Sequence, residues 1–132
     1  MTANRIPEHL VNLLTSSIET IERLDIVLHF RANPGRSYGA RTVAKALGAS
    51  VRTTEKDLAV LCGRGFLTVN IGADLLFAYQ PVSGSVDAAL GEIEILNREI
   101  RRELVAMLAK HEGSDSVQTF ANAVLLKKSD PS

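Results

Sequence analysis

The hydrophobic positions in the first quarter of the chain recur at three- and four-residue intervals, the spacing of helices that bury one face. A short lead helix is expected over residues 7–14. A second helix is expected to begin at a capping box formed by Ser16 and Glu19 and to end at Pro34. The apolar stripe of this second helix consists of Ile18, Ile21, Leu24 and Leu28.

Two shorter helices are expected next, joined by a tight turn. Ser37 is placed to cap the first of them and Gly48 to end it in a left-handed conformation. Ser50 is placed to cap the second, and Gly65 closes it. The positions expected to face inward are Ala40, Val43, Ala44 and Leu47 in the first helix and Thr54, Leu58 and Leu61 in the second.

After residue 66 the hydrophobic residues recur at every second position, which predicts a β-hairpin. The first strand alternates through Leu67, Val69 and Ile71, and a glycine-containing turn follows at residues 72–74. The second strand runs back with Leu75, Phe77 and Tyr79 on one side.

A long helix is expected after a linker, from Val86 to about His111, with Ser85 as its cap. A helix of about 26 residues spans nearly 40 Å, more than a small domain can cover, so part of its stripe is expected to contact a second copy. Charges of both signs flank the stripe, as in a coiled coil. The alternative is that the helix packs on its own domain. The expected dimerisation residues are Leu90, Ile93, Leu96, Ile100, Leu104 and Met107.

The formal net charge of zero hides an uneven distribution. Residues 35–66 hold six basic and two acidic side chains, a net charge of +4, whereas residues 86–112 have a net charge of −2. Salt screens distant charges within about 10 Å, so a polyanion responds to the local field. The basic segment is therefore a usable footprint for nucleic acid.

Several classes of protein are not supported by the sequence. The single cysteine, Cys62, forms no disulfide framework and is expected to be a partly buried structural thiol, with a redox sensor as the alternative. His9, His29 and His111 share no ligand spacing, so no metal is expected. No phosphate loop, nucleophile elbow, signal peptide or membrane span is seen. We expect a cytoplasmic, non-enzymatic protein without a cofactor.

Three helices followed by a hairpin resemble the winged helix-turn-helix DNA-binding superfamily, over residues 17–81. Ala44, Leu47 and Gly48 resemble the alanine, leucine and turn glycine of that motif. The terminal helices are most similar to those of MarR-type or PadR-type bacterial regulators. The MarR-type wing usually carries an Asp-x-Arg pair. Here the hairpin has an aspartate, Asp74, but no arginine. The expected organisation is a lead helix at 1–16, a winged helix-turn-helix domain at 17–81, a linker and long dimerisation helix at 82–112, and an amphipathic tail at 113–132.

The resemblance implies a mainly α protein with a small β-hairpin, in which the helix at about 51–64 enters the major groove of double-stranded DNA as part of a homodimeric transcriptional regulator. A small-molecule effector is common in MarR-like proteins. The alternative is a winged-helix adaptor for other proteins, working through the long helix and the tail; Glu55 and Asp57 favour it. The expected DNA-binding residues are Arg36, Ser37, Arg41, Lys45, Ser50, Arg52, Thr53, Lys56 and Arg64.

Overall fold

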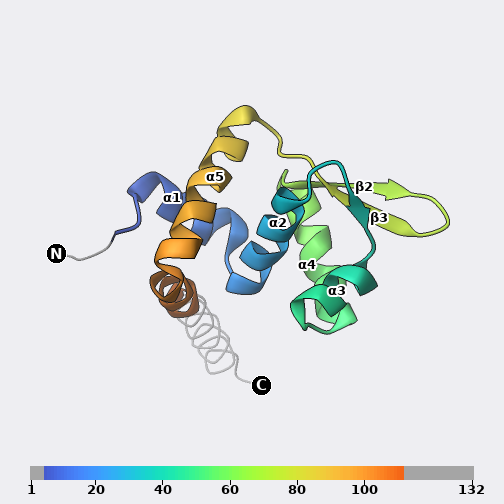
Figure 1. The fold of residues 1–132 in the computed structure, drawn as a ribbon, viewed down its shortest axis with the longest axis horizontal. Helices are drawn as coiled ribbons and strands as arrows, with labels where there is room; N and C mark the ends of the chain where they lie inside the picture. The colour runs from blue at the N-terminus through green and yellow to red at the C-terminus, as the bar shows by residue number, and fades with distance from the viewer. Residues whose placement is uncertain (1–4, 112–132) are drawn as a thin grey trace, which may run out of the picture.

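The computed structural model describes residues 5–111 of the 132-residue chain. In Figure 1, α1 and α5 lie together at one end, α2 lies in the middle, and α3, α4 and the hairpin form the other end. The expected tail at 113–132 lies outside the described residues. The elements in chain order are α1 (Glu8–Leu13), η1 (Leu14–Ile18), α2 (Ile21–Ala32), β1 (Ser37–Tyr38), α3 (Ala40–Leu47), α4 (Val51–Gly63), β2 (Leu67–Ile71), β3 (Leu75–Tyr79) and α5 (Gly84–Glu99).

The predicted hairpin is confirmed, and a third strand that the sequence did not reveal joins it. β2 and β3 pair antiparallel with Val69 opposite Phe77, and β1 pairs with the other edge of β3, giving the order β1-β3-β2. The prediction that Ser37 caps a helix is wrong, because Ser37 belongs to β1. Gly35, with φ of 82°, helps to turn the chain back from α2 so that residues 37 and 38 run beside β3.

The predicted start of the second helix is also wrong. Leu14 and Ile18 are fully buried, and the lead helix passes through them as a π-turn, η1, instead of ending before Ser16. The chain then reverses at Glu19, whose φ is 76°, and α2 begins after Thr20. The Thr20 side chain accepts a hydrogen bond from the backbone N–H of Arg23 and is the true cap.

The connection between α3 and α4 follows the local signals closely. Gly48 has φ of 68°, the left-handed conformation expected at the end of α3, and Ser50 caps α4. All three residues expected to face inward in α4 are buried, as are Val43 and Ala44 in α3. Leu47 is the exception: 36% of its surface is exposed, so the prediction that it faces inward is wrong.

The long C-terminal helix is interrupted. α5 begins at Gly84 and is capped by Ser83, which accepts from the N–H of Val86; the predicted cap at Ser85 is wrong. The helix ends at Glu99, Ile100 leaves the helical conformation with φ of −135°, and residues 101–111 are helical again. The chain therefore has two helical segments here instead of one straight helix of about 26 residues.

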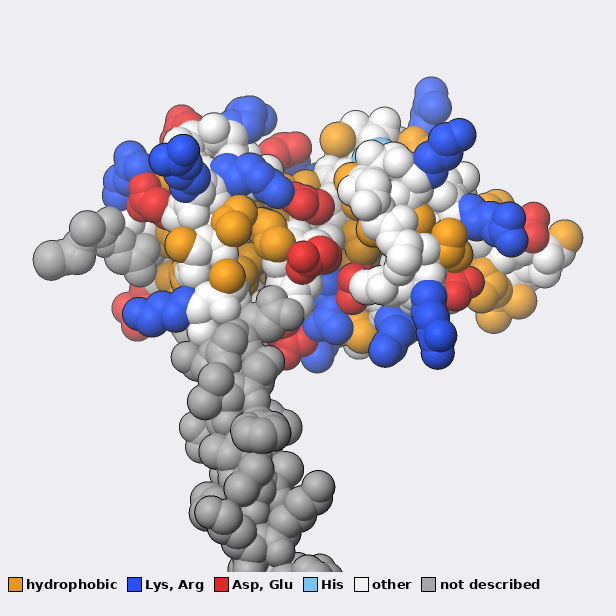
Figure 2. Space-filling view, turned by 90° about the horizontal axis from the view of Figure 1, so that it is seen from below, with side chains coloured by type: hydrophobic (Ala, Val, Ile, Leu, Met, Phe, Trp, Pro, Cys, Tyr) orange, Lys and Arg blue, Asp and Glu red, His pale blue; other side chains and the backbone are white. Residues whose placement is uncertain are grey.

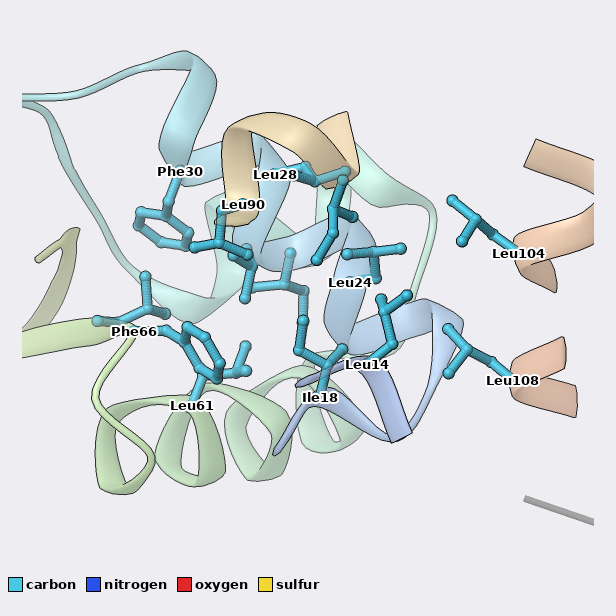
Figure 3. Packing of buried hydrophobic residues seen from close by; sticks show 14 of the residues in the cluster. Leu14, Ile18, Leu24, Leu28, Phe30, Leu61, Phe66, Leu90, Leu104 and Leu108 are labelled. Carbon is cyan, nitrogen blue, oxygen red and sulfur yellow. The ribbon is translucent and has the colours of Figure 1, made fainter. Parts of the chain in front are cut away.

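The apolar stripe of these two segments belongs to the core of the single chain. Leu90, Ile93 and Leu104 have no exposed surface, and Ile100 is also buried. Figure 3 shows Leu104 and Leu108 pointing towards the cluster that contains Leu14 and Leu24. The inference that the stripe needs a second copy to cover it is therefore wrong, because the lead segment and α2 cover it. The remaining stripe residues, Leu96 and Met107, are half-buried against the same cluster.

Polar contacts also attach α5 to the rest of the domain. Arg31 of α2 donates to Glu94 at 2.7 Å, and the Tyr79 hydroxyl of β3 donates to Asp87 at 2.5 Å. Burial, together with this hydrogen bond, raises the pKa of Tyr79, so the phenol stays protonated. A Cβ at Gly91 would lie 2.9 Å from a guanidinium nitrogen of Arg31, so a larger residue there would displace the end of the Arg31 side chain.

Candidate nucleic-acid interface

The first turn of α4 presents two hydroxyl groups to solvent. Ser50 accepts a hydrogen bond from the N–H of Thr53 at 3.1 Å and donates its own hydrogen to the Thr53 hydroxyl at 2.8 Å. The Thr53 hydroxyl accepts in this pair, so its hydrogen can point outward to an acceptor such as a phosphate oxygen. The exposed start of a capped helix is a favourable place for an anion.

The outer face of α4 carries two exposed cations one turn apart. Arg52 and Lys56 are exposed, while Thr54 and Leu58 on the opposite face are buried. Within residues 5–111, neither cation forms an ion pair with an acidic side chain. Their charges are therefore available to a ligand.

Three further cations surround this helix. Arg36 precedes β1, and Arg41 and Lys45 lie on the exposed side of α3, which packs against α4. In the described part of the chain these three also have no acidic partner. Figure 2 shows basic side chains projecting around the end of the molecule that contains α3, α4 and the hairpin. By contrast, the arginines with acidic partners are Arg5, Arg23, Arg31, Arg64 and Arg101.

Arg64, predicted to bind DNA, is held by its own chain. Its guanidinium donates to Glu19 at 2.6 Å and to the carbonyl of Ser17 at 2.8 Å. Glu19 also accepts from Arg23, whose Nε donates to Asp57 at 2.9 Å. The four side chains form a network that fixes α4 against η1 and α2, so we assign Arg64 to positioning α4 and remove it from the DNA-binding set.

Asp57 is a residue whose role the sequence analysis misjudged. In the sequence it favours the adaptor together with Glu55, but in the structure it lies on the inner side of α4 and is only 8% exposed. Its charge is compensated by Arg23, so Glu55 is the acidic residue of α4 that remains exposed. A signal was present, because Asp57 lies three residues after Thr54 and next to Leu58 on the inward stripe.

The hairpin tip has a different character from α3 and α4. Asp74 is its one charged side chain, and Ile71 and Leu75 are exposed at 77% and 52%. A hollow of about 510 Å³ separates the tip from the helices, and Arg41, Glu55 and Asp74 all line it. The hairpin therefore offers no cation to a phosphate, and Asp74 places a negative charge near the basic surface.

A second hollow, of about 560 Å³, lies where α2, the end of β3 and the start of α5 meet, and is lined by Arg31, Tyr79 and Asp87. Whether it takes a small-molecule effector stays a prediction. Among residues 5–111, no group of three or more histidine, cysteine or acidic side chains is arranged to hold a metal ion. No helix in the same range has the length and apolar character to cross a membrane.

Comparisons with known proteins identify the fold. No family model and no curated protein matches the chain. A solved homodimeric winged helix-turn-helix DNA-binding domain from Mycobacterium bovis, described as a possible ArsR-family transcriptional regulator, is 14% identical; the match covers 75% of this chain and 93% of that one, with a TM-score of 0.51. Apo MarR from E. coli is 17% identical, over 98% of this chain and 100% of that one, with a TM-score of 0.45. The match to the Mycobacterium bovis domain confirms the predicted fold: this chain has a winged helix-turn-helix fold.

Proposed function

We propose that this chain is a sequence-specific, DNA-binding transcriptional regulator that acts in the cytoplasm as a homodimer and is not an enzyme. The observation that carries this proposal is a set of exposed cations on α3, α4 and the preceding loop that have no acidic partner among residues 5–111. Cations in ion pairs contribute little to a polyanion's attraction, whereas these five are available to phosphates and base edges. They are Arg36, Arg41, Lys45, Arg52 and Lys56.

The contacts divide into two kinds. Arg52 and Lys56 project from α4, which has the dimensions to enter the major groove, and an arginine there can make paired hydrogen bonds to guanine. Ser50 and Thr53 lie at the start of the same helix, where a backbone phosphate is expected. Ser37 is not part of this group, because it lies in β1 and caps no helix.

The zero net charge does not oppose this proposal. Asp57 and Glu19 are paired with arginines inside the domain, so they weaken the outward field less than free carboxylates would. The acidic residues that remain exposed near the basic surface include Glu55 and Asp74, beside Arg41, and Glu22, which lines a hollow together with Thr53. The net charge of the basic surface is therefore positive even though that of the chain is zero.

The homodimer rests on a different kind of support. The Mycobacterium bovis domain with the same fold is described as homodimeric and DNA-binding. Because residues 5–111 already bury the apolar stripe of α5 in their own core, we place the contact between two copies outside that stripe.

The decisive experiment is a salt-titrated DNA-binding series, on a site selected from genomic fragments by sequencing the bound pool. Arg52→Ala should weaken binding to the selected site by about 1–3 kcal/mol and relax discrimination at one base position. Lys56→Ala should weaken binding to all sequences similarly and lower the salt slope by roughly one unit. The matched control is Arg98→Ala, which removes an exposed arginine of α5 and should change neither quantity.

A second candidate function is supported by the apolar hairpin tip. Ile71 and Leu75 are exposed where a phosphate-binding wing would carry cations, which suits a winged-helix adaptor for other proteins. If the folded wild-type chain shows no salt-dependent affinity for any duplex, the regulator is excluded and the adaptor takes its place.

A further inference from the structure

The outer face of α4 carries an acidic residue between its two cations. The buried residues of α4 are Thr54, Asp57, Leu58 and Leu61. The exposed residues opposite them that recur at helical spacing are Arg52, Glu55, Lys56 and Ala59. Residues three, four and seven positions apart share one face of a helix. A ligand that contacts Arg52 and Lys56 through this face therefore also meets the carboxylate of Glu55.

The side chain of Glu55 has no partner among residues 5–111. No ion pair joins it to Arg52 or Lys56, or to Arg41, which lines the same hollow beside the hairpin. Asp57, two residues further on, is by contrast 8% exposed and hydrogen-bonded inside the domain. The described fold therefore uses the carboxylate of Asp57 and leaves that of Glu55 available to a ligand.

The major groove sets strict conditions for a carboxylate. An ionised carboxylate only accepts hydrogen bonds, and a charged group that loses its water without gaining a donor is strongly disfavoured. Guanine presents two acceptors in this groove, and thymine presents one acceptor beside its methyl group. The donors are the amino groups at cytosine N4 and adenine N6, and adenine places the N7 acceptor beside its amino group. Cytosine is therefore the base whose edge suits a carboxylate best.

We propose that Glu55 is a specificity-determining residue, which accepts a hydrogen bond from the N4 amino group of a cytosine in the major groove. This inference rests on the proposed function and adds a base preference to it. Glu55 lies three residues after Arg52, about 4.5 Å along the helix axis, and base pairs are about 3.4 Å apart. The cytosine is therefore expected within about one base pair of the guanine that Arg52 contacts.

The same carboxylate would act against other sequences. Guanine or thymine at this position brings an acceptor oxygen towards Glu55, so the carboxylate stays unpaired and is repelled. An exposed acid that acts only through its field instead weakens binding to every sequence alike. Asp74 is the matched control, because it is also exposed and lines the same hollow, but it lies in the hairpin and not on α4.

Binding of the full chain to duplexes that differ at one base pair separates these two roles. Wild type should prefer cytosine at one position of its selected site by at least about tenfold, within the range for a single mismatched base pair. Glu55→Ala should bind all four bases at that position within about threefold and keep the guanine preference set by Arg52. Asp74→Asn should keep the cytosine preference. If Glu55→Ala changes the affinity for all four bases by the same factor, Glu55 acts through its field and the inference is wrong.

Glu55→Gln makes the test sharper, because glutamine pairs with adenine through N6 and N7. The preferred base should change from cytosine to adenine at the same position, whereas a role through the field alone predicts no change of preference. The side chain at this position is exposed, so both variants should keep the circular dichroism spectrum of wild type.

A modified base tests the contact from the DNA side without changing the protein. In a paired N4-methylcytosine the remaining N4 hydrogen bonds to guanine, and the methyl group replaces the hydrogen that faces the major groove. This base at the selected cytosine should weaken wild-type binding at least about tenfold and leave the binding of Glu55→Ala unchanged. An equal loss in both proteins, or no loss in wild type, would overturn the inference.

The outcomes distinguish this inference from the function on which it rests. If wild type binds one duplex selectively but shows no preference that depends on Glu55, the DNA-binding proposal stands and this inference falls. If the folded wild-type chain binds no duplex, both fall.

Discussion

Replacing Arg23 tests whether the internal ion-pair network holds α4 in place. Asp57 depends on Arg23, because its side chain is 11% exposed and the Arg23 Nε at 2.9 Å is its hydrogen-bond partner. Glu19 would keep Arg64 as a partner. Arg23→Met retains most of the side-chain volume but leaves the Asp57 carboxylate unpaired. Removing one partner of a fully buried ion pair lowers the free energy of unfolding by about 3–5 kcal/mol, and removing one partner of an exposed pair lowers it by at most about 1 kcal/mol. Because this pair is mostly buried, we expect Arg23→Met to lower the free energy of unfolding by roughly 2–4 kcal/mol.

The assay is denaturant unfolding followed by circular dichroism, with a second arginine–aspartate pair as the control. Arg101 contacts Asp25 at 2.9 and 3.0 Å, but the side chains are 46% and 31% exposed, so Arg101→Met should cost less than about 1 kcal/mol. Adding Asp57→Leu to Arg23→Met should recover most of the lost stability, because no carboxylate is then left unpaired. If Arg23→Met costs no more than Arg101→Met, or the double variant recovers nothing, the network does not hold α4 as described.

Three further outcomes follow from single positions. Gly48→Ala should cost about 1 kcal/mol of unfolding free energy, because φ is 68° there and a Cβ would meet no atom within 4 Å; an unchanged midpoint would show that the left-handed conformation is not required. Ile93→Asp should leave the chain unfolded by circular dichroism, because that position has no exposed surface; a stable folded monomer would instead restore it to a dimer seam. Asp74→Asn should tighten binding to DNA slightly, with a larger gain at low salt, and an unchanged or weaker affinity in a salt titration would place the hairpin tip away from the duplex.

The part of the fold that sequence could predict is the part that local signals determine. Gly48 and Ser50 sit at the end of one helix and the start of the next, and each needs only its own backbone conformation or a bond within three residues. The alternation from Leu67 to Ile71 likewise requires only the neighbouring strand. These elements were placed correctly because few distant contacts influence them.

The errors occur where distant contacts decide between local alternatives. Ser16 and Thr20 are both plausible caps, and Thr20 is selected because the reversal at Glu19 lets that carboxylate reach both Arg23 and Arg64. Ser37 could cap a helix, but the edge of β3 offers it a strand partner in Ala78. Neither choice is visible in the nearby sequence.

Periodicity failed in a different way in α5. It correctly identified Leu90, Ile93 and Leu104 as one apolar stripe, but a stripe does not reveal which surface covers it. The length argument for a second copy assumed one straight helix. The break at Ile100 and the apolar lead segment, with Leu14 buried against the same cluster, removed the need for a partner.

The same distinction applies to the charges of the candidate interface, and it explains why the net charge of zero misleads. In a sequence Arg64 and Arg52 count equally, as do Asp57 and Glu55. In the structure Arg64 and Asp57 compensate charges inside the domain, whereas Arg52 and Glu55 face solvent. Since a polyanion responds to uncompensated charge within about 10 Å, the basic surface is set by these pairings and not by composition. Removing an internal acid such as Asp57 should therefore change DNA affinity mainly by displacing α4, while removing Glu55 should change it with α4 left in place.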